Sequence, residues 1–213
     1  MIMKNIKKIN RMAMVLTLLL LLFSACSSDD SEPIENINSE ASLVLTQMEK
    51  DALVFMMEEE RLARDVYDRL FAKLGLNQFQ NIAKSEQSHM DAVENLLKHY
   101  NLPYTILEAG TFQNSDLQAA YDSLVVQGEA NIIGALSSGA TIEDLDIFDL
   151  ENWMAKIENV VILDVFSKLQ CGSRNHLRAF TGSLDMEEAT YTPQFISQSE
   201  YEQIINDDNE KCN

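Results

Sequence analysis

Proline is scarce in this chain, and its scarcity limits the folds that the chain can adopt. Only three prolines occur, at Pro33, Pro103 and Pro193. The segments between them are rich in Leu, Ala, Met, Glu, Gln and Lys, with apolar residues at helical spacing. Proline interrupts helices, whereas these other residue types favour them. The sequence therefore predicts an all-α protein.

Helix start and stop signals predict a first helical hairpin. Thr46 and Glu49 have the spacing of a capping box, and the helix that they open is expected to run to Leu74 and stop at Gly75. A second helix is expected over residues 77–100, ahead of Pro103.

A second hairpin is expected after a long connection. The connection, residues 101–140, contains a predicted helix over 115–126 and a short helical piece over 130–136. A helix over 141–157 follows, and Asn159 is expected to cap another that ends near Phe180, before Gly182. Two hairpins joined by one long crossover describe a four-helix bundle.

The N-terminus has the features of a secretory signal. A basic segment over 1–11 precedes an apolar run over 12–23, which is too short to span a bilayer. Small residues then lead to Cys26, which resembles the lipid-modified cysteine of bacterial lipoproteins, although Phe23 stands where an aliphatic residue is usual. An ordinary cleaved signal with a chance cysteine is the alternative.

The predicted parts of the chain are a lipoprotein signal peptide (1–25), an acidic flexible tether (26–42), a helical domain (43–205) and a C-terminal tail (206–213). Such a protein is expected in the cell envelope, as an outer-membrane lipoprotein held by its lipid anchor. The acidic tether resembles the export tag of surface-displayed lipoproteins, and a spacer facing the periplasm is the alternative.

Acidic residues strongly outnumber basic ones. The chain has 34 Asp and Glu against 16 Lys and Arg, a formal charge of −18, which falls to −22 when the signal and its four basic residues are removed. This charge excludes nucleic acid as a partner and attracts cations. The sequence leaves open whether Cys171 and Cys212 pair and whether the protein forms a homo-oligomer.

Glu86 and His89 interrupt an apolar stripe of the second predicted helix. The rest of the stripe consists of Phe79, Ile82, Val93, Leu96 and Tyr100. Residues three apart lie on one helical face, so both polar side chains are expected to point into the core. A buried carboxylate without a partner is costly, which indicates that a cation compensates it.

The other predicted helices offer further inward-facing ligands. Glu60 lies on the inward stripe of the first helix, whereas Glu58 and Glu59 are expected to be solvated. His176 lies on the inward stripe of the last helix, and an ordinary core histidine is the alternative.

Glu143 lies on the inward stripe of the third long helix. Alternatively, Glu143 and Asp144 only complement the dipole in the first turn of that helix. His99 lies off its stripe and is expected to be an ordinary surface residue.

Helical bundles that hold two iron or manganese ions use one Glu from each of two helices and a Glu-x-x-His pair from each of the other two. This chain has Ser173 where the second pair would have its Glu, so an asymmetric site is expected, with Asp146 or water in the gap. The predicted metal ligands are Glu60, Glu86, His89, Glu143 and His176. Side chains that could orient them are Tyr67, Arg64, Arg174 and Arg178, although the arginines could instead neutralise the acidic surface.

The segments that carry these residues resemble a known family. They are FMMEEERLARDVY (55–67), NIAKSEQSH (81–89), IEDLDI (142–147) and GSRNHLRAF (172–180). They are similar to the uncharacterised bacterial family called domain of unknown function 2202, of the ferritin-like superfamily. The first segment also resembles the first ligand helix of rubrerythrin-like ferritins. The resemblance implies a ferritin-like fold and assigns no reaction.

These patterns favour a metal-binding lipoprotein with a non-haem iron site, either mononuclear or di-iron, with manganese and zinc as alternative metals. A di-iron site would allow oxidation of Fe(II) by oxygen or peroxide, an oxidase- or peroxidase-type activity, or a role in metal homeostasis. The main alternative is a non-catalytic envelope-binding or structural module whose buried polar residues form a hydrogen-bond network. A metal sensor or carrier without turnover is a third hypothesis.

Overall fold

The computed structural model describes residues 44–212, and within this range every regular element is a helix. The all-α prediction is therefore confirmed. None of these helices is both long and apolar enough to cross a membrane. The predicted signal peptide, Cys26 and the whole of the acidic tether lie outside the described residues.

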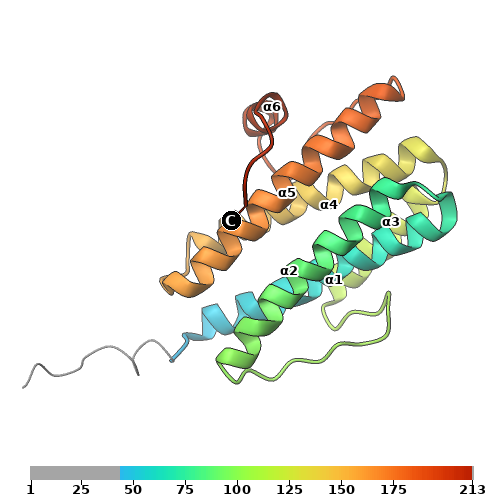
Figure 1. Cartoon of the computed structure of the whole chain (residues 1–213). Coiled ribbons are helices and arrows are strands. Elements are labelled where there is room, and N and C mark those ends of the chain that lie inside the picture. Colours follow the sequence, from blue (N-terminus) through green and yellow to red (C-terminus); the bar gives the residue numbers. More distant parts are fainter. Residues whose placement is uncertain (1–43, 213) are drawn as a thin grey trace, which may run out of the picture. The chain divides into compact units, whose positions relative to one another are not determined.

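Two pairs of long helices make up most of the described chain (Figure 1). The first pair is α1 (Gln47–Leu74) with α2 (Asn77–His99), and the second is α4 (Ile132–Met154) with α5 (Val160–Met186). Helix α3 (Ser115–Gly128) belongs to the connection between the pairs and contacts α1 and α4. A short sixth helix, α6 (Gln198–Asn206), lies against α5.

The ends of α1 follow the sequence signals closely. The Thr46 hydroxyl accepts a hydrogen bond from the Glu49 amide, and the Glu49 carboxylate accepts one from the Thr46 amide, so the capping box is complete. Gly75 ends the helix with a left-handed φ of 71°, a conformation that glycine adopts without a steric penalty. These two predictions are confirmed.

Helix α4 differs from the prediction, because its N-terminus lies nine residues earlier. The expected short piece and the expected start at Thr141 are parts of one helix, which Asn131 caps by accepting from the Gly134 amide. Gly139 does not break the helix; a Cβ there would lie 2.5 Å from the Phe180 ring, so glycine allows close packing of α4 on α5. Glu143 therefore lies in the helix interior, and the alternative of a first-turn charge is wrong.

Helix α5 is capped by Asn159, as predicted, but it continues to Met186 instead of ending near Phe180. Gly182 lies inside it, and a Cβ there would meet nothing within 4 Å. A glycine in an exposed helical position lowers helix stability by only about 1 kcal/mol. The packing of α5 on the rest of the protein outweighs this loss.

Two apolar clusters fill the interior, and a polar layer separates them along the helices. One cluster includes Leu53, Met56, Met90, Val93, Leu150 and Phe166. The other includes Val66, Tyr67, Phe79, Ile142, Leu177 and Phe180. Each long helix passes from one cluster to the other near its predicted ligands, so these ligands are brought to the same level.

Polar side chains of α1 hold the long connection after α2. The carboxylate of Glu58 accepts from the amides of Gln113 and Asn114 at 2.7 and 2.9 Å. The buried guanidinium of Arg61 donates to the carbonyls of Leu107, at 2.8 Å, and Thr111. Glu58 is buried by these contacts, so its prediction as a solvated residue is wrong.

The C-terminal segment is fixed to the outer side of α5. A disulfide joins Cys171 to Cys212, which resolves the question that the sequence left open. Glu210 accepts hydrogen bonds from both Arg174 and Arg178. These two arginines therefore bind the C-terminal segment instead of the predicted metal ligands.

Candidate metal centre

The five predicted ligands come together in the polar layer as two overlapping groups. Glu60, Glu86 and His89 form one group, and the other consists of Glu86, Glu143 and His176. Within each group, one ligand atom per residue lies within 4.8 Å of the others. All four long helices contribute, and Glu86 belongs to both groups.

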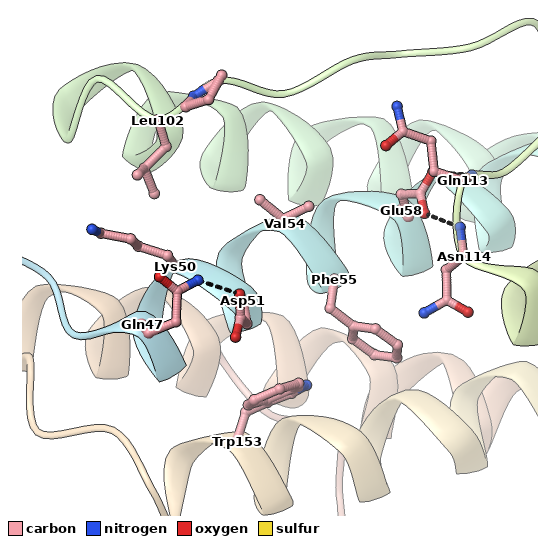
Figure 2. A pocket seen from close by; sticks show the side chains of 11 residues that line it. Gln47, Lys50, Asp51, Val54, Phe55, Glu58, Leu102, Gln113, Asn114 and Trp153 are labelled. Atoms are coloured by element: carbon pink, nitrogen blue, oxygen red, sulfur yellow. Dashed lines mark hydrogen bonds between the residues drawn. The ribbon is translucent and has the colours of Figure 1, made fainter.

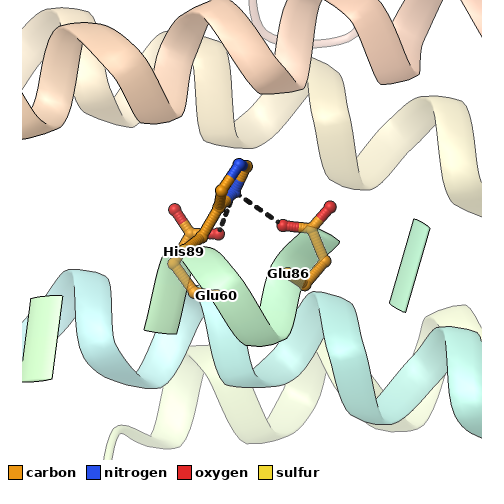
Figure 3. A group of neighbouring side chains, drawn as sticks. All are labelled: Glu60, Glu86 and His89. Atoms are coloured by element: carbon orange, nitrogen blue, oxygen red, sulfur yellow. Dashed lines mark hydrogen bonds and ion pairs between the residues drawn. The ribbon is translucent and has the colours of Figure 1, made fainter. Parts of the chain in front are cut away.

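In the first group, the Nδ1 atom of His89 faces two carboxylates (Figure 3). It lies 3.1 Å from Oε2 of Glu60 and 2.9 Å from Oε2 of Glu86. The Glu86 carboxylate is bound through one oxygen here, which leaves Oε1 for the second group.

In the second group, the Nδ1 atom of His176 lies 2.8 Å from Oε1 of Glu86 and 3.4 Å from Oε2 of Glu143. Neither His176 Nδ1 nor Glu86 Oε1 has a partner with hydrogen-bond geometry, although both are buried. Buried polar atoms that lie close together without hydrogen-bond partners would be stabilised by a cation bound between them.

Asp146 lies beside Ser173, the residue that stands where the second pair would have its Glu. The Ser173 hydroxyl donates to Oδ2 of Asp146, while Oδ1 of Asp146 is buried and has no hydrogen-bond partner. The aspartate of α4 thus adds a carboxylate to the layer at the point where α5 lacks its Glu. Asp146 belongs to neither ligand group, and the two groups, each with two carboxylates and one histidine, are the ones that could hold a metal ion.

Of the side chains predicted to orient the ligands, Tyr67 contacts one of the predicted ligands directly. Its buried hydroxyl donates to Oε1 of Glu143 at 2.5 Å. Arg64 instead donates to Asp65 and Gln87.

The electrostatics of the layer follow from burial and from the two imidazoles. Burial raises the pKa of Glu60 to about 7, with His89 opposing the rise. Burial also disfavours ionised Glu86, but the charges of His89 and His176 outweigh it and lower the Glu86 pKa. Burial lowers the pKa of His176, yet the charges of Glu86 and Glu143 reverse this and bring it to about 10. Without a metal, the layer thus holds ionised Glu86 between two protonated imidazoles.

Sequence reasoning missed Glu59, which was predicted to be solvated. Its side chain is 2% exposed, and neither carboxylate oxygen has a hydrogen-bond partner. A second apolar line on α1, formed by Phe55, Leu62 and Val66, passes through position 59 and would have indicated burial.

Gly172 leaves room for the His89 ring. A Cβ at this position would lie 2.6 Å from Nε2 and 2.7 Å from Cε1 of His89. We expect Gly172→Ala to displace the imidazole and to weaken metal binding about 10- to 100-fold, as loss of ligand support does in metalloproteins. Titration with Co(II), followed by calorimetry, measures the change.

Gly182→Ala is the matched control, because it adds the same methyl group to α5 where nothing lies within 4 Å. It is expected to bind Co(II) as the unmodified protein does. Equal affinities for the two variants would show that the His89 ring does not need this space.

Residues of α1, α4 and the long connection line a surface cavity of about 560 Å³ (Figure 2). Its walls include Phe55 and Val54 of α1, Trp153 of α4 and Leu102 of the long connection. None of the five predicted ligands lines it. The predicted ligands are therefore confined to the buried polar layer and do not reach this cavity.

Comparisons with known proteins identify relatives without an assigned activity. The model of the uncharacterized protein domain DUF2202 matches residues 49–208. The uncharacterized protein MJ0754 of Methanocaldococcus jannaschii is 47% identical over 180 residues, which are 84% of this chain and 97% of the relative. The crystal structure of hypothetical protein MJ0754 from Methanococcus jannaschii matches with a TM-score of 0.77 at 48% identity, over 78% of this chain and 97% of that chain. The chain therefore belongs to the DUF2202 family.

Proposed function

We propose that this protein is a ferritin-like metal protein whose polar layer binds two iron ions. The observation that carries the proposal is that Glu86 belongs to both ligand groups and that each group also contains one histidine. Glu60, Glu86 and His89 would hold one ion, and Glu86, Glu143 and His176 would hold the other.

The ligand atoms of the polar layer are of types that bind iron. Carboxylates and imidazoles bind iron, manganese and zinc, whereas the layer has no thiolate among its donors. Glu60, Glu86, Glu143 and Asp146 together carry four negative charges when ionised, which two divalent ions would balance. Charge balance removes the cost of burying these carboxylates.

The residues of the chain would have distinct roles at the loaded site. Glu86 would contribute to the binding of both ions, His89 and His176 would each contribute to one, and Tyr67 would hold Glu143 in place. Iron bound there as Fe(II) would be the electron donor and would become Fe(III), with oxygen or peroxide as the oxidant that is reduced. The proposal includes lipid attachment at Cys26 and a location in the cell envelope, both supported by the sequence pattern at the N-terminus.

The test is to add Fe(II) to the purified protein without oxygen, measure bound iron, and then admit oxygen. We expect two ions per chain and oxygen consumption that depends on them. Bound iron without oxygen consumption would support a carrier instead. A protein that binds no metal would overturn the proposal and support a structural polar layer.

Metal binding is expected to release protons. In the metal-free protein the pKa of His176 is about 10 and that of His89 is also raised, so both imidazoles are protonated near pH 7. Metal and proton compete for the same Nδ1 atom, so the affinity should rise as pH rises from 6 to 8, about tenfold per pH unit for each displaced proton. Calorimetry in buffers of different ionisation enthalpy counts the released protons. An affinity independent of pH would contradict the assignment of the imidazoles as ligands.

A further inference from the structure

The cavity between α1, α4 and the long connection is large enough for a small organic molecule. Its volume of about 560 Å³ lies within the range of about 300–1,000 Å³ that is typical of ligand pockets. Val54, Phe55, Leu102 and Trp153 give it apolar walls, and Val54 is 39% exposed. Water therefore contacts apolar surface in the cavity, and a ligand that covers this surface gains free energy from the hydrophobic effect.

Two aromatic rings form part of the wall. The ring centroids of Phe55 and Trp153 are 5.8 Å apart, and the ring planes are tilted by 52° (Figure 2). Both residues are only partly buried. Aromatic rings pack favourably on one another in tilted arrangements at this spacing. The pair therefore favours a ligand whose apolar body is itself an aromatic ring.

The wall also contains three charged side chains, those of Lys50, Asp51 and Glu58. Asp51 accepts a hydrogen bond from the Gln47 side chain at 2.7 Å, and Glu58 accepts from two backbone amides of the long connection (Figure 2). Lys50 is half-buried and forms no ion pair or hydrogen bond with another residue that the structure describes. The two acids are therefore bound within the protein, whereas the ammonium group is free to bind a ligand.

Further donors lie near the ammonium group of Lys50. Asn114 lines the cavity, and its Oδ1 accepts from two amides at the start of α3, while its Nδ2 donates to no residue in the described part of the chain. The Nζ atom of Lys156 lies 5.4 Å from the centre of the Trp153 ring, which places a second ammonium group beside the aromatic wall. Ammonium and amide donors without partners suit a ligand with acceptor oxygens.

We propose that this cavity binds a small organic acid, with an aromatic body against Phe55 and Trp153 and a carboxylate that accepts from Lys50 and Asn114. The inference goes beyond the proposed function and does not depend on bound metal. A hydrogen bond between an ammonium group and a carboxylate is roughly twice as strong as one between neutral groups. The apolar walls supply affinity, and the donors select a ligand with a negative charge.

The test uses the single tryptophan of the chain, because Trp153 lines the cavity. The full chain is titrated with phenylbutyrate, and the emission of Trp153 is recorded under excitation that phenylbutyrate does not absorb. An apolar ring that covers a partly exposed indole shifts its emission to shorter wavelength. We expect a saturable shift with phenylbutyrate, and weaker binding of phenylbutanol, which has the same apolar body without the charge.

Two substitutions test the charge. Lys50→Met keeps most of the apolar stem and removes the ammonium group, so we expect it to bind phenylbutyrate about tenfold more weakly and phenylbutanol as before. Val54→Asp adds a carboxylate to the wall and should weaken binding of phenylbutyrate more than binding of phenylbutanol. Lys73→Met is the matched control, because Lys73 is exposed on the same helix and does not line the cavity. Circular dichroism shows whether each variant is folded.

Three results would overturn the proposal. The first is an emission that phenylbutyrate does not change. The second is equal affinity for phenylbutyrate and phenylbutanol that neither Lys50→Met nor Val54→Asp alters, because the cavity would then bind apolar molecules without regard to charge. The third is an emission that depends on protein concentration and not on phenylbutyrate, because a second copy of the chain would then cover the cavity.

Discussion

Glu86→Ala is expected to abolish binding of both metal ions. Glu86 provides Oε2 to the group with His89 and Oε1 to the group with His176, so its removal takes a ligand from each. Loss of one ligand from a three-ligand group weakens binding far more than loss of a supporting contact, for which 10- to 100-fold is typical. The iron content, measured by elemental analysis after Fe(II) loading, should fall from two ions per chain to none. The double variant with His89→Ala should give the same result.

His99→Ala is the control, because His99 is exposed and lies outside both groups. It should retain both ions. Circular dichroism confirms that each variant is folded before its metal content is compared. Two ions bound by Glu86→Ala would refute the assignment of Glu86 as the shared ligand.

Asp144→Ala is expected to lower the free energy of unfolding of the metal-free protein by about 3–5 kcal/mol. The carboxylate of Asp144 is fully buried and accepts hydrogen bonds from the amides of Gln194, Phe195 and Ile196 and from the Tyr191 hydroxyl. Alanine leaves the two buried donors, the Tyr191 hydroxyl and the Ile196 amide, without an acceptor, at about 1–3 kcal/mol each before relaxation. Urea unfolding measures the loss.

Asp164→Ala serves as the comparison, since Asp164 is exposed and pairs only with Lys168. Its removal should change the free energy of unfolding by less than about 1 kcal/mol. Asp144→Asn keeps one acceptor oxygen and should fall between the two alanine variants. If Asp144→Ala is as stable as Asp164→Ala, the segment before α6 is held by its apolar contacts instead.

Structural features that depend only on residues close together in the sequence could be predicted from the sequence. The Thr46 capping box, the Gly75 stop and the Asn159 cap are local, and each occurs as predicted. The placement of Glu86 and His89 on one buried face also follows from spacing alone.

Features that depend on contacts between distant segments could not be predicted in this way. Helix α4 begins nine residues before the expected start at Thr141, and Gly139 inside it allows the close contact with Phe180 on α5. Glu58 and Glu59 stand in a run of three acids that is typical of an exposed face, yet the long connection binds the first and α4 covers the second. The partners of Asp144 lie some fifty residues further along the chain.

The division of the interior into two apolar clusters has a consequence for how this sequence can change. Folding is driven by the clusters on either side, and both are formed by residues that touch no proposed ion. Substitutions within the intervening layer can therefore alter which ion is preferred without repacking either hydrophobic half. A single helical scaffold of this kind can host several chemistries.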